Sequence, residues 1–250
     1  MERLPKGVPL VLSVGLLHPN IDRPVEKPLS GYTFSIEALN GGWDQFLSIE
    51  VFHRKNRTKT PTTWPLARAG DPPRGVRLTS DHQQAVVHYV LSPEATAQLT
   101  PGEYAITAEL RTEQGASKAS WTGKLQAAWK ILVVEKQPKV APSAACYLAL
   151  NSFEYFNVLG RPKDGLQALN DALTVAPPGF AWACLDKRAS IAEQSGNLAG
   201  AKDDYCKATT DIYVGRIAEM AARKPGSLMP YYTRTTLEEH CERLTALLKK

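Results

Sequence analysis

The stretch GNLAGAKDDYCKA, residues 196–208, decides how the second half of the chain is interpreted. Ala201, Tyr205 and Ala208 follow one another at intervals of four and three, directly after a Gly-Asn pair. This spacing puts the three side chains on one face of an α-helix. A related stretch, GRPKDGLQALNDA, lies thirty-six residues earlier in the sequence.

Superposing the two stretches matches glycine with glycine at the start and small or apolar residues along the helix. The matched pairs are Gly160 with Gly196, Gly165 with Ala201, Leu169 with Tyr205, and Ala172 with Ala208. A candidate helix precedes each stretch, at 143–158 and at 181–194. The sequence therefore predicts two units of helix, glycine turn and helix, with small residues where helices cross closely.

The sequence after the second unit predicts further helix. Residues 212–223 continue without a helix-breaking residue, and a loop around KPGSLMPYY follows. Thr235 and Glu238 form a capping-box pattern at the start of a last helix. Its expected apolar stripe consists of Leu237, Cys241, Leu244 and Leu248. Because the end of a repeat array needs covering, we expect this helix to be a cap.

Helix pairs at this spacing resemble the tetratricopeptide repeat, over the residues from Cys146 to Tyr213. The first helix of each unit departs from the family pattern of an aromatic residue followed by a Leu-Gly pair. The chain has Ala149 and Ser152-Phe153 in the first unit, then Leu185 and Arg188-Ala189 in the second.

The resemblance implies a binding site, because in that family the first helices line a concave groove that takes peptides. The residues so implied are Tyr147, Leu150, Glu154 and Asn157 from the first unit, and Asp186, Ser190, Glu193 and Gln194 from the second. Leu150 and Glu154 replace the Lys and Asn that clamp a terminal carboxylate in chaperone-binding members, so no such clamp is expected. The mildly acidic lining favours a basic or neutral peptide. Alternatively, the final helix or the first domain fills the groove.

The first half of the chain has a period of two. In SGYTFSIEAL, Tyr32, Phe34, Ile36 and Ala38 alternate with polar residues, and PGEYAITAELRT at 101–112 repeats the pattern. Such alternation is typical of strands that bury one face. Further strands are expected near 8–17, 46–53, 74–79, 84–91, 118–124 and 127–135, with turns at 40–42, 71–73 and 101–102.

These strands, with no helix predicted between them, indicate an antiparallel β-sandwich. The Leu-Thr-Pro-Gly-Glu-Tyr turn at 99–104 resembles that of bacterial immunoglobulin-like modules, although this half has no Cys-Trp-Cys core. The Pro-containing segment 136–143 is the expected linker. We therefore expect two domains, a sandwich at 1–138 and a tetratricopeptide-like helical domain at 139–250.

Composition and motifs argue against several classes of protein. The net charge of +5 is spread over both halves, which does not favour a nucleic-acid partner. No apolar run reaches the length of a membrane span, and 7–17 reads as a first strand rather than a signal segment. Catalytic and metal-binding motifs are absent, and His82 and His88 lack a third ligand nearby. Asp203 and Asp204 are expected on the solvent side of a helix. The basic run 53–60 reads as a solvated loop tip, although a contact for phosphate or an acidic polymer is the alternative.

Four cysteines fall in the second half: Cys146, Cys184, Cys206 and Cys241. Free buried thiols are the favoured interpretation, and disulfides in an oxidising compartment are the alternative. Cys146 and Cys184 lie near the starts of neighbouring predicted helices and are the more plausible pair. Cys241 lies on an apolar stripe, which also suits a core thiol.

The sequence thus predicts a non-enzymatic interaction or assembly protein that binds a peptide or protein partner through the helical groove. No catalytic residue, metal or cofactor is expected, and the oligomeric state stays open. A bacterial origin and a periplasmic or secreted location are implied by the sandwich type, with a cytoplasmic location as the alternative. The alternative function is recognition of carbohydrate or cell-wall polymer by exposed Trp43, Trp64 and Trp121 on the sandwich.

Overall fold

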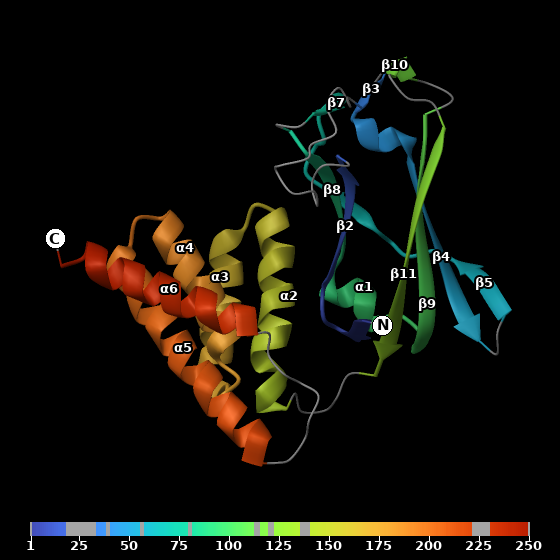
Figure 1. Ribbon diagram of the computed structural model, residues 1–250. Helices are drawn as coiled ribbons and strands as arrows, with labels where there is room; N and C mark the ends of the chain where they lie inside the picture. Colours follow the sequence, from blue (N-terminus) through green and yellow to red (C-terminus); the bar gives the residue numbers. More distant parts are fainter. Residues whose placement is uncertain are drawn as a thin grey trace. The chain divides into compact units, whose positions relative to one another are not determined.

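The computed structural model shows a β region followed by a helical region, which confirms that coarse expectation (Figure 1). It describes residues 2–18, 34–38, 41–55, 58–79, 82–112, 116–119, 123–135, 141–221 and 231–249. The chain divides into two compact units, Met1–Lys136 and Gln137–Lys250. Tyr32, Trp121 and residues 136–140 of the expected linker lie outside the described residues.

The larger sheet of the β unit has five strands. Their order is β1 (Glu2–Pro5), β11 (Lys124–Val134), β9 (Gly102–Arg111), β4 (Leu47–Lys55) and β5 (Thr58–Thr62). β1 pairs with β11 in parallel, and the other neighbours are antiparallel. The period of two predicted for 101–112 is confirmed, because Tyr104, Ile106, Ala108 and Leu110 are all buried.

Two three-stranded sheets complete the β unit. One has the order β10 (Ala116–Ala119), β3 (Phe34–Ala38) and β7 (Gly75–Leu78), and the other β2 (Leu10–Leu17), β8 (Gln84–Leu91) and β6 (Ala67–Ala69). Two short helices, η1 (Trp43–Phe46) and α1 (Pro93–Ala97), interrupt the strands. A single apolar cluster includes Ile106, Leu12 and Ile36, one from each sheet, so all three sheets share a core.

The basic run was wrongly predicted to be a loop tip. Its residues 53–55 end β4, and Thr58 begins β5, which pairs antiparallel with β4. Of the strand expected at 118–124, residues 118–119 belong to β10 and Lys124 begins β11, while residues 120–122 lie outside the described residues. Polar and charged side chains on both sides of an edge hairpin do not distinguish it from a loop in the sequence.

In the described part of the helical unit, a short turn, η2 (Pro142–Ala144), is followed by five longer helices. They are α2 (Ala145–Val158), α3 (Pro162–Val175), α4 (Trp182–Gln194), α5 (Leu198–Ala221) and α6 (Tyr231–Leu247). α2 packs against α3 and α4 against α5, so the two predicted helix pairs form (Figure 1). α6 packs on α5 and supplies Leu237 and Leu244 to a common apolar cluster.

The turns of the two pairs have the same geometry. Gly160 and Gly196 both have positive φ, at 71° and 81°. After Gly160, the N–H of Arg161 donates to the carbonyl oxygen of Phe156 at 2.8 Å. After Gly196, the N–H of Asn197 donates to the carbonyl oxygen of Ala192, also at 2.8 Å. Both turns are therefore Schellman-type helix ends, which need glycine because other residues are strained at positive φ.

Small residues lie where the paired helices approach. A Cβ added to Gly165 would lie 2.8 Å from Cδ2 of Phe153 on α2. Ala201 and Ala208 are fully buried between α5 and its neighbours. The predicted spacing of small residues thus serves close helix packing.

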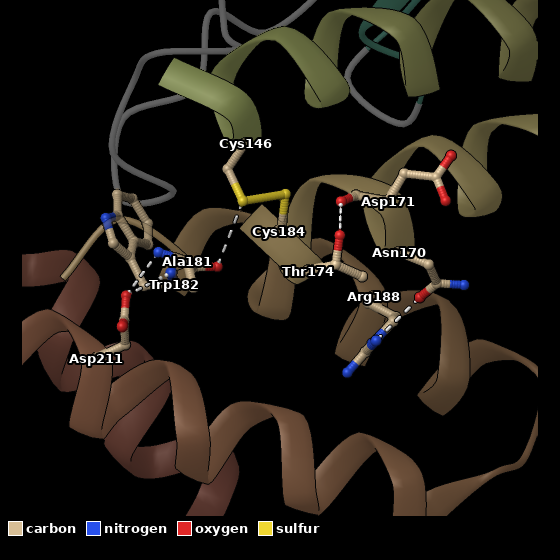
Figure 2. Close-up of a disulfide and its surroundings, with 9 residues drawn as sticks. All are labelled: Cys146, Asn170, Asp171, Thr174, Ala181, Trp182, Cys184, Arg188 and Asp211. Carbon is tan, nitrogen blue, oxygen red and sulfur yellow. Dashed lines mark hydrogen bonds between the residues drawn. A yellow bond between two sulfur atoms is a disulfide. The ribbon is translucent and has the colours of Figure 1, made fainter. Parts of the chain in front are cut away.

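Four local predictions in the helical unit were wrong. α6 begins at Tyr231, so Thr235 does not cap it, and Leu248 follows the helix and is exposed. Asp204, expected in solvent with Asp203, is buried. The free-thiol interpretation also fails, because one disulfide joins Cys146 to Cys184 (Figure 2) and a second joins Cys206 to Cys241. The first pair is the one that the sequence favoured.

Candidate functional site

The first-unit residues of the expected groove lie along α2. Tyr147 is 50% exposed and Asn157 is also exposed, whereas Leu150 and Glu154 are partly buried. Leu150 packs against the apolar cluster that contains Cys146 and Phe153, so its side chain is shared between core and surface. The exposed tyrosine is the feature of α2 best suited to contact a partner.

The first disulfide fixes the helix that carries this tyrosine. Cys146, directly before Tyr147, is bonded to Cys184 on α4 with a Cα–Cα distance of 5.4 Å. Lys187, one turn further along α4, forms an ion pair with Glu154 at 2.8 Å. Its ammonium also lies 4.8 Å from the ring centroid of Phe153. The two helices that supply the expected groove are thus held together by a covalent bond and by charge.

The second-unit residues lie along α4 and are less accessible. Asp186, Ser190 and Glu193 are partly buried, while Gln194 is exposed and donates to the Ser190 hydroxyl at 3.4 Å. Burial raises the pKa of Asp186, an effect opposed by the nearby charges of His240 and Lys187. The carboxylate therefore lies in a poorly solvated position rather than on an open surface.

Helix α6 contacts this second part of the groove. Arg243 donates to Oε1 of Glu193 at 2.5 Å, and Nδ1 of His240 lies 4.0 Å from Oε2 of the same carboxylate. The His240 ring stacks on Tyr205 of α5, with centroids 4.7 Å apart and planes inclined by 18°. The last helix of the chain thus occupies part of what the sequence analysis assigned to a partner.

These contacts change the expected charge of the groove. Glu154 is neutralised by Lys187 and Glu193 by Arg243. These ion pairs offset two of the three acidic side chains of the expected groove, which reduces the electrostatic advantage of a basic peptide.

Tyr205 should make the helical unit sensitive to alkali. Burial, followed by the negative charges of Glu193 and Asp186, raises the pKa of Tyr205 to about 12. Since the folded pKa exceeds the unfolded value, this stabilisation is complete below about pH 10 and is lost as pH rises towards about 12. We expect urea unfolding, followed by circular dichroism, to show a loss of roughly 2 kcal/mol over this range. Tyr205→Phe should remove that loss, and equal pH slopes for both proteins would contradict the assignment.

An internal polar network joins helices α3, α4 and α5. Arg188 donates to Oδ2 and Oδ1 of Asp204 at 2.6 and 2.7 Å, and to Oδ1 of Asn170 at 2.9 Å. Arg188 and Asp204 belong to the second helix pair, and the hydrogen bond to Asn170 on α3 links them to the first pair. Two acidic residues in a row on a helix look like a solvated face, so the sequence pattern around Asp203 and Asp204 did not indicate this network.

A second network closes the start of α4 (Figure 2). The carboxylate of Asp211 on α5 accepts from the backbone N–H groups of Gly179, Ala181 and Trp182 at 2.7, 2.8 and 2.8 Å. Helix α4 has no side-chain cap of its own. A carboxylate from the following helix thus satisfies its free N-terminal donors.

Two of the three tryptophans expected to bind carbohydrate are not on the surface. Trp43 is fully buried and Trp64 is 5% exposed. Trp64 packs 5.0 Å from the ring centroid of Tyr104, inside the core. Trp121 lies outside the described residues. The expectation that Trp43 and Trp64 offer stacking faces for a sugar was therefore wrong.

The described residues contain neither a metal-binding cluster nor a helix suited to crossing a membrane. Within them, no group of three or more His, Cys, Asp or Glu side chains could hold a metal ion. His88 shares a hydrogen bond of 2.8 Å with Ser13, and the backbone N–H of His82 donates to Thr79. In this part of the chain no helix combines the length and apolar character that crossing a membrane requires.

Comparisons with known proteins assign the chain to no family. No family model matches the sequence, and no curated protein matches it. A solved structure of AggA, the major subunit of aggregative adherence fimbriae type I from Escherichia coli, aligns with 54% of this chain and 91% of its own. The identity is 15% and the TM-score 0.26, values that do not establish a shared fold.

Proposed function

We propose that this is a non-enzymatic interaction or assembly protein that binds a neutral, extended peptide segment of a partner along helices α2 and α4. The observation that carries the proposal is the exposed Tyr147 next to the Cys146–Cys184 disulfide. An aromatic residue on a rigid support is an effective anchor, because little conformational freedom is lost on binding. The neutralised Glu154 favours a partner without a strong positive charge.

The proposal includes a tetratricopeptide-like identity for the helical unit and an immunoglobulin-like sandwich for the β unit. The repeated helix pair with equivalent glycine turns supports the former. Antiparallel strands around one core support the latter. Two disulfides are typical of oxidising compartments, and they support a periplasmic or secreted location in a bacterium.

The binding role predicts a selective effect of Tyr147→Ala. Peptides selected from a displayed random library on the disulfide-bonded protein should bind this variant at least about tenfold more weakly, which is roughly 1.4 kcal/mol. Isothermal titration calorimetry measures the change. Phe180→Ala is a matched control, because Phe180 is 45% exposed but lies outside α2 and α4.

Two results would count against this function. Equal affinity of the native protein and Tyr147→Ala for the selected peptides would move the site away from α2. Failure of repeated selections to yield any peptide that competes in solution would remove the peptide-binding role itself. Circular dichroism of the variant must match that of the native protein in either case.

A further inference from the structure

The β unit contains an apolar groove that the helical site does not use. Its volume is about 490 Å³. It is lined by Val14, Gly15, Leu16, Leu17, Phe34, Leu47, Leu78, Ala108, Leu110, Leu125, Gln126 and Ala127. Three sheets contribute to this lining, and Gln126 is its one polar residue among those described.

Two strand edges run along the groove. β2 is the outer strand of its sheet and pairs with β8 alone among the described strands. β11 pairs with β9 along its length, but β1 covers its other edge from Ile131 to Val134. Beside Lys124–Lys130, no described strand pairs with that edge. Consecutive residues of both strands, 14–17 and 125–127, line the groove, so it follows their edges.

The side chains of β11 are buried beside β1 and become exposed beyond the point where β1 ends. Ile131 and Val133, which point to the core beside β1, are 3% and 1% exposed. Leu125, on the same face but beyond β1, is 48% exposed, and Ala127 is exposed as well. Their partners across β9, Leu110 and Ala108, are buried core residues. A strand added beside Lys124–Lys130 would therefore extend the core where β1 leaves off.

We infer that this groove docks an extended strand from a partner polypeptide, with apolar residues at alternate positions. Unpaired strand edges offer backbone N–H and C=O groups for a ladder, and the apolar floor accepts every second side chain. A small apolar ligand would fill the floor but would leave these backbone groups without a partner.

The charged residues at the rim of the groove determine which outward-facing side chains of the docked strand are favoured. Lys124 and Lys130 alternate with the groove-facing residues of β11 and are exposed. Lys124 forms an ion pair with Glu109 on β9, so the two lysines leave a net positive rim. Outward side chains of the docked strand lie next to this rim, which favours glutamate or aspartate over lysine or arginine. The partner segment is thus an amphipathic strand with acidic outward residues.

Hydrogen exchange with a synthetic peptide tests this inference on the full disulfide-bonded chain. The probe is a peptide of about nine residues that alternates valine with glutamate or threonine. A peptide of the same composition in scrambled order is the control. We expect the alternating peptide, at saturation, to slow exchange of the amides at 10–17 and 124–130 by about tenfold or more. Scrambling should abolish this effect.

Variants locate the docked strand. Leu125→Glu should weaken peptide binding by about tenfold or more, and Leu17→Glu provides an independent variant on the other edge. Both leucines are about half exposed, at 48% and 55%, so folding should be retained. Leu247→Glu is a matched control, since Leu247 is 49% exposed in the helical unit.

Each other outcome overturns the inference. Equal protection by the scrambled peptide would show non-specific binding, and no protection at saturation would show that no strand docks. Binding of dodecanoate in the groove, without a protecting effect of the peptide, would assign it to small apolar ligands. Tyr147 lies outside the β unit, so Tyr147→Ala should leave the protection of 10–17 and 124–130 by the alternating peptide unchanged. This result would distinguish the groove from the proposed helical site.

Discussion

Reduction of the two disulfides should unfold the helical unit and leave the β unit folded. The bridges close loops of 38 and 35 residues that follow one another along the chain, so their effects on the unfolded state are independent. Chain entropy assigns roughly 4 kcal/mol to each loop of this length. Removing both costs an amount comparable to the whole stability of a small domain.

The positions of the bridges explain why the effect is large. Within each helix pair, packing joins α2 to α3 and α4 to α5. The disulfides act between other helices, since Cys146–Cys184 joins α2 to α4 and Cys206–Cys241 joins α5 to α6. The disulfides therefore join helices from different pairs, or a pair to α6, where no short turn already holds the helices together.

Circular dichroism at 222 nm with increasing urea, with and without a phosphine reductant, measures this effect. Helical signal should be lost at a lower urea concentration after reduction. Tryptophan emission, measured in a Trp182→Phe background so that every remaining tryptophan lies in the β unit, should keep its transition. The paired variants Cys146→Ala/Cys184→Ala and Cys206→Ala/Cys241→Ala should each reproduce part of the shift. A helical transition unchanged by reductant would contradict the stabilising role of the bridges.

Replacement of Asp211 by alanine should destabilise the helical unit by roughly 3 kcal/mol. The substitution removes three hydrogen bonds from backbone N–H groups to a charged acceptor and leaves the start of α4 uncapped. The negative charge also favours the N-terminal end of the helix dipole. Because Cys184 belongs to the first turns of α4, loss of the cap also loosens the helix that carries the disulfide.

Graded variants separate the two contributions of Asp211. Asp211→Asn keeps one acceptor oxygen and loses the charge, so its cost should lie between zero and that of Asp211→Ala. Asp203→Ala is the matched control on the same helix, because Asp203 is exposed and its ion pair with Lys202 contributes little. Urea unfolding of the three proteins gives the comparison. Equal stability of Asp211→Ala and Asp203→Ala would show that water replaces the cap.

The sequence predicted what depends on neighbours along the chain. The period of two at 101–112 and the repeated spacing around Gly160 and Gly196 led to β structure followed by paired helices. Local geometry decides these features, since side-chain direction repeats with each strand residue or helix turn, and glycine alone readily adopts positive φ.

The outer strands and the end of the helical region were harder to predict. The hairpin at 53–60 looked like a loop, because an exposed edge strand carries polar residues on both sides. Thr235 looked like a helix cap, because the capping-box pattern is short and also occurs inside helices. In both cases the local signal was weak and long-range packing decided the structure.

The expected groove was also predicted in part, in its local features but not in its long-range contacts. Helix periodicity identified which residues share a face of α2, and Tyr147 is indeed exposed there. No sequence pattern showed that Lys187 pairs with Glu154, or that α6 brings Arg243 to Glu193. These contacts join residues far apart in the chain, and they alone set the charge that a partner meets.

By itself, the sequence determined the two kinds of secondary structure, the glycine turns and the small residues at helix crossings. Only the tertiary structure decided that the four cysteines are paired, that Asp204 is buried against Arg188, and that Asp211 caps α4. It also decided which edges of β2 and β11 line a groove. The physical reason is that local conformation depends on successive residues, whereas pairing, burial and open edges depend on which distant segments the fold brings together.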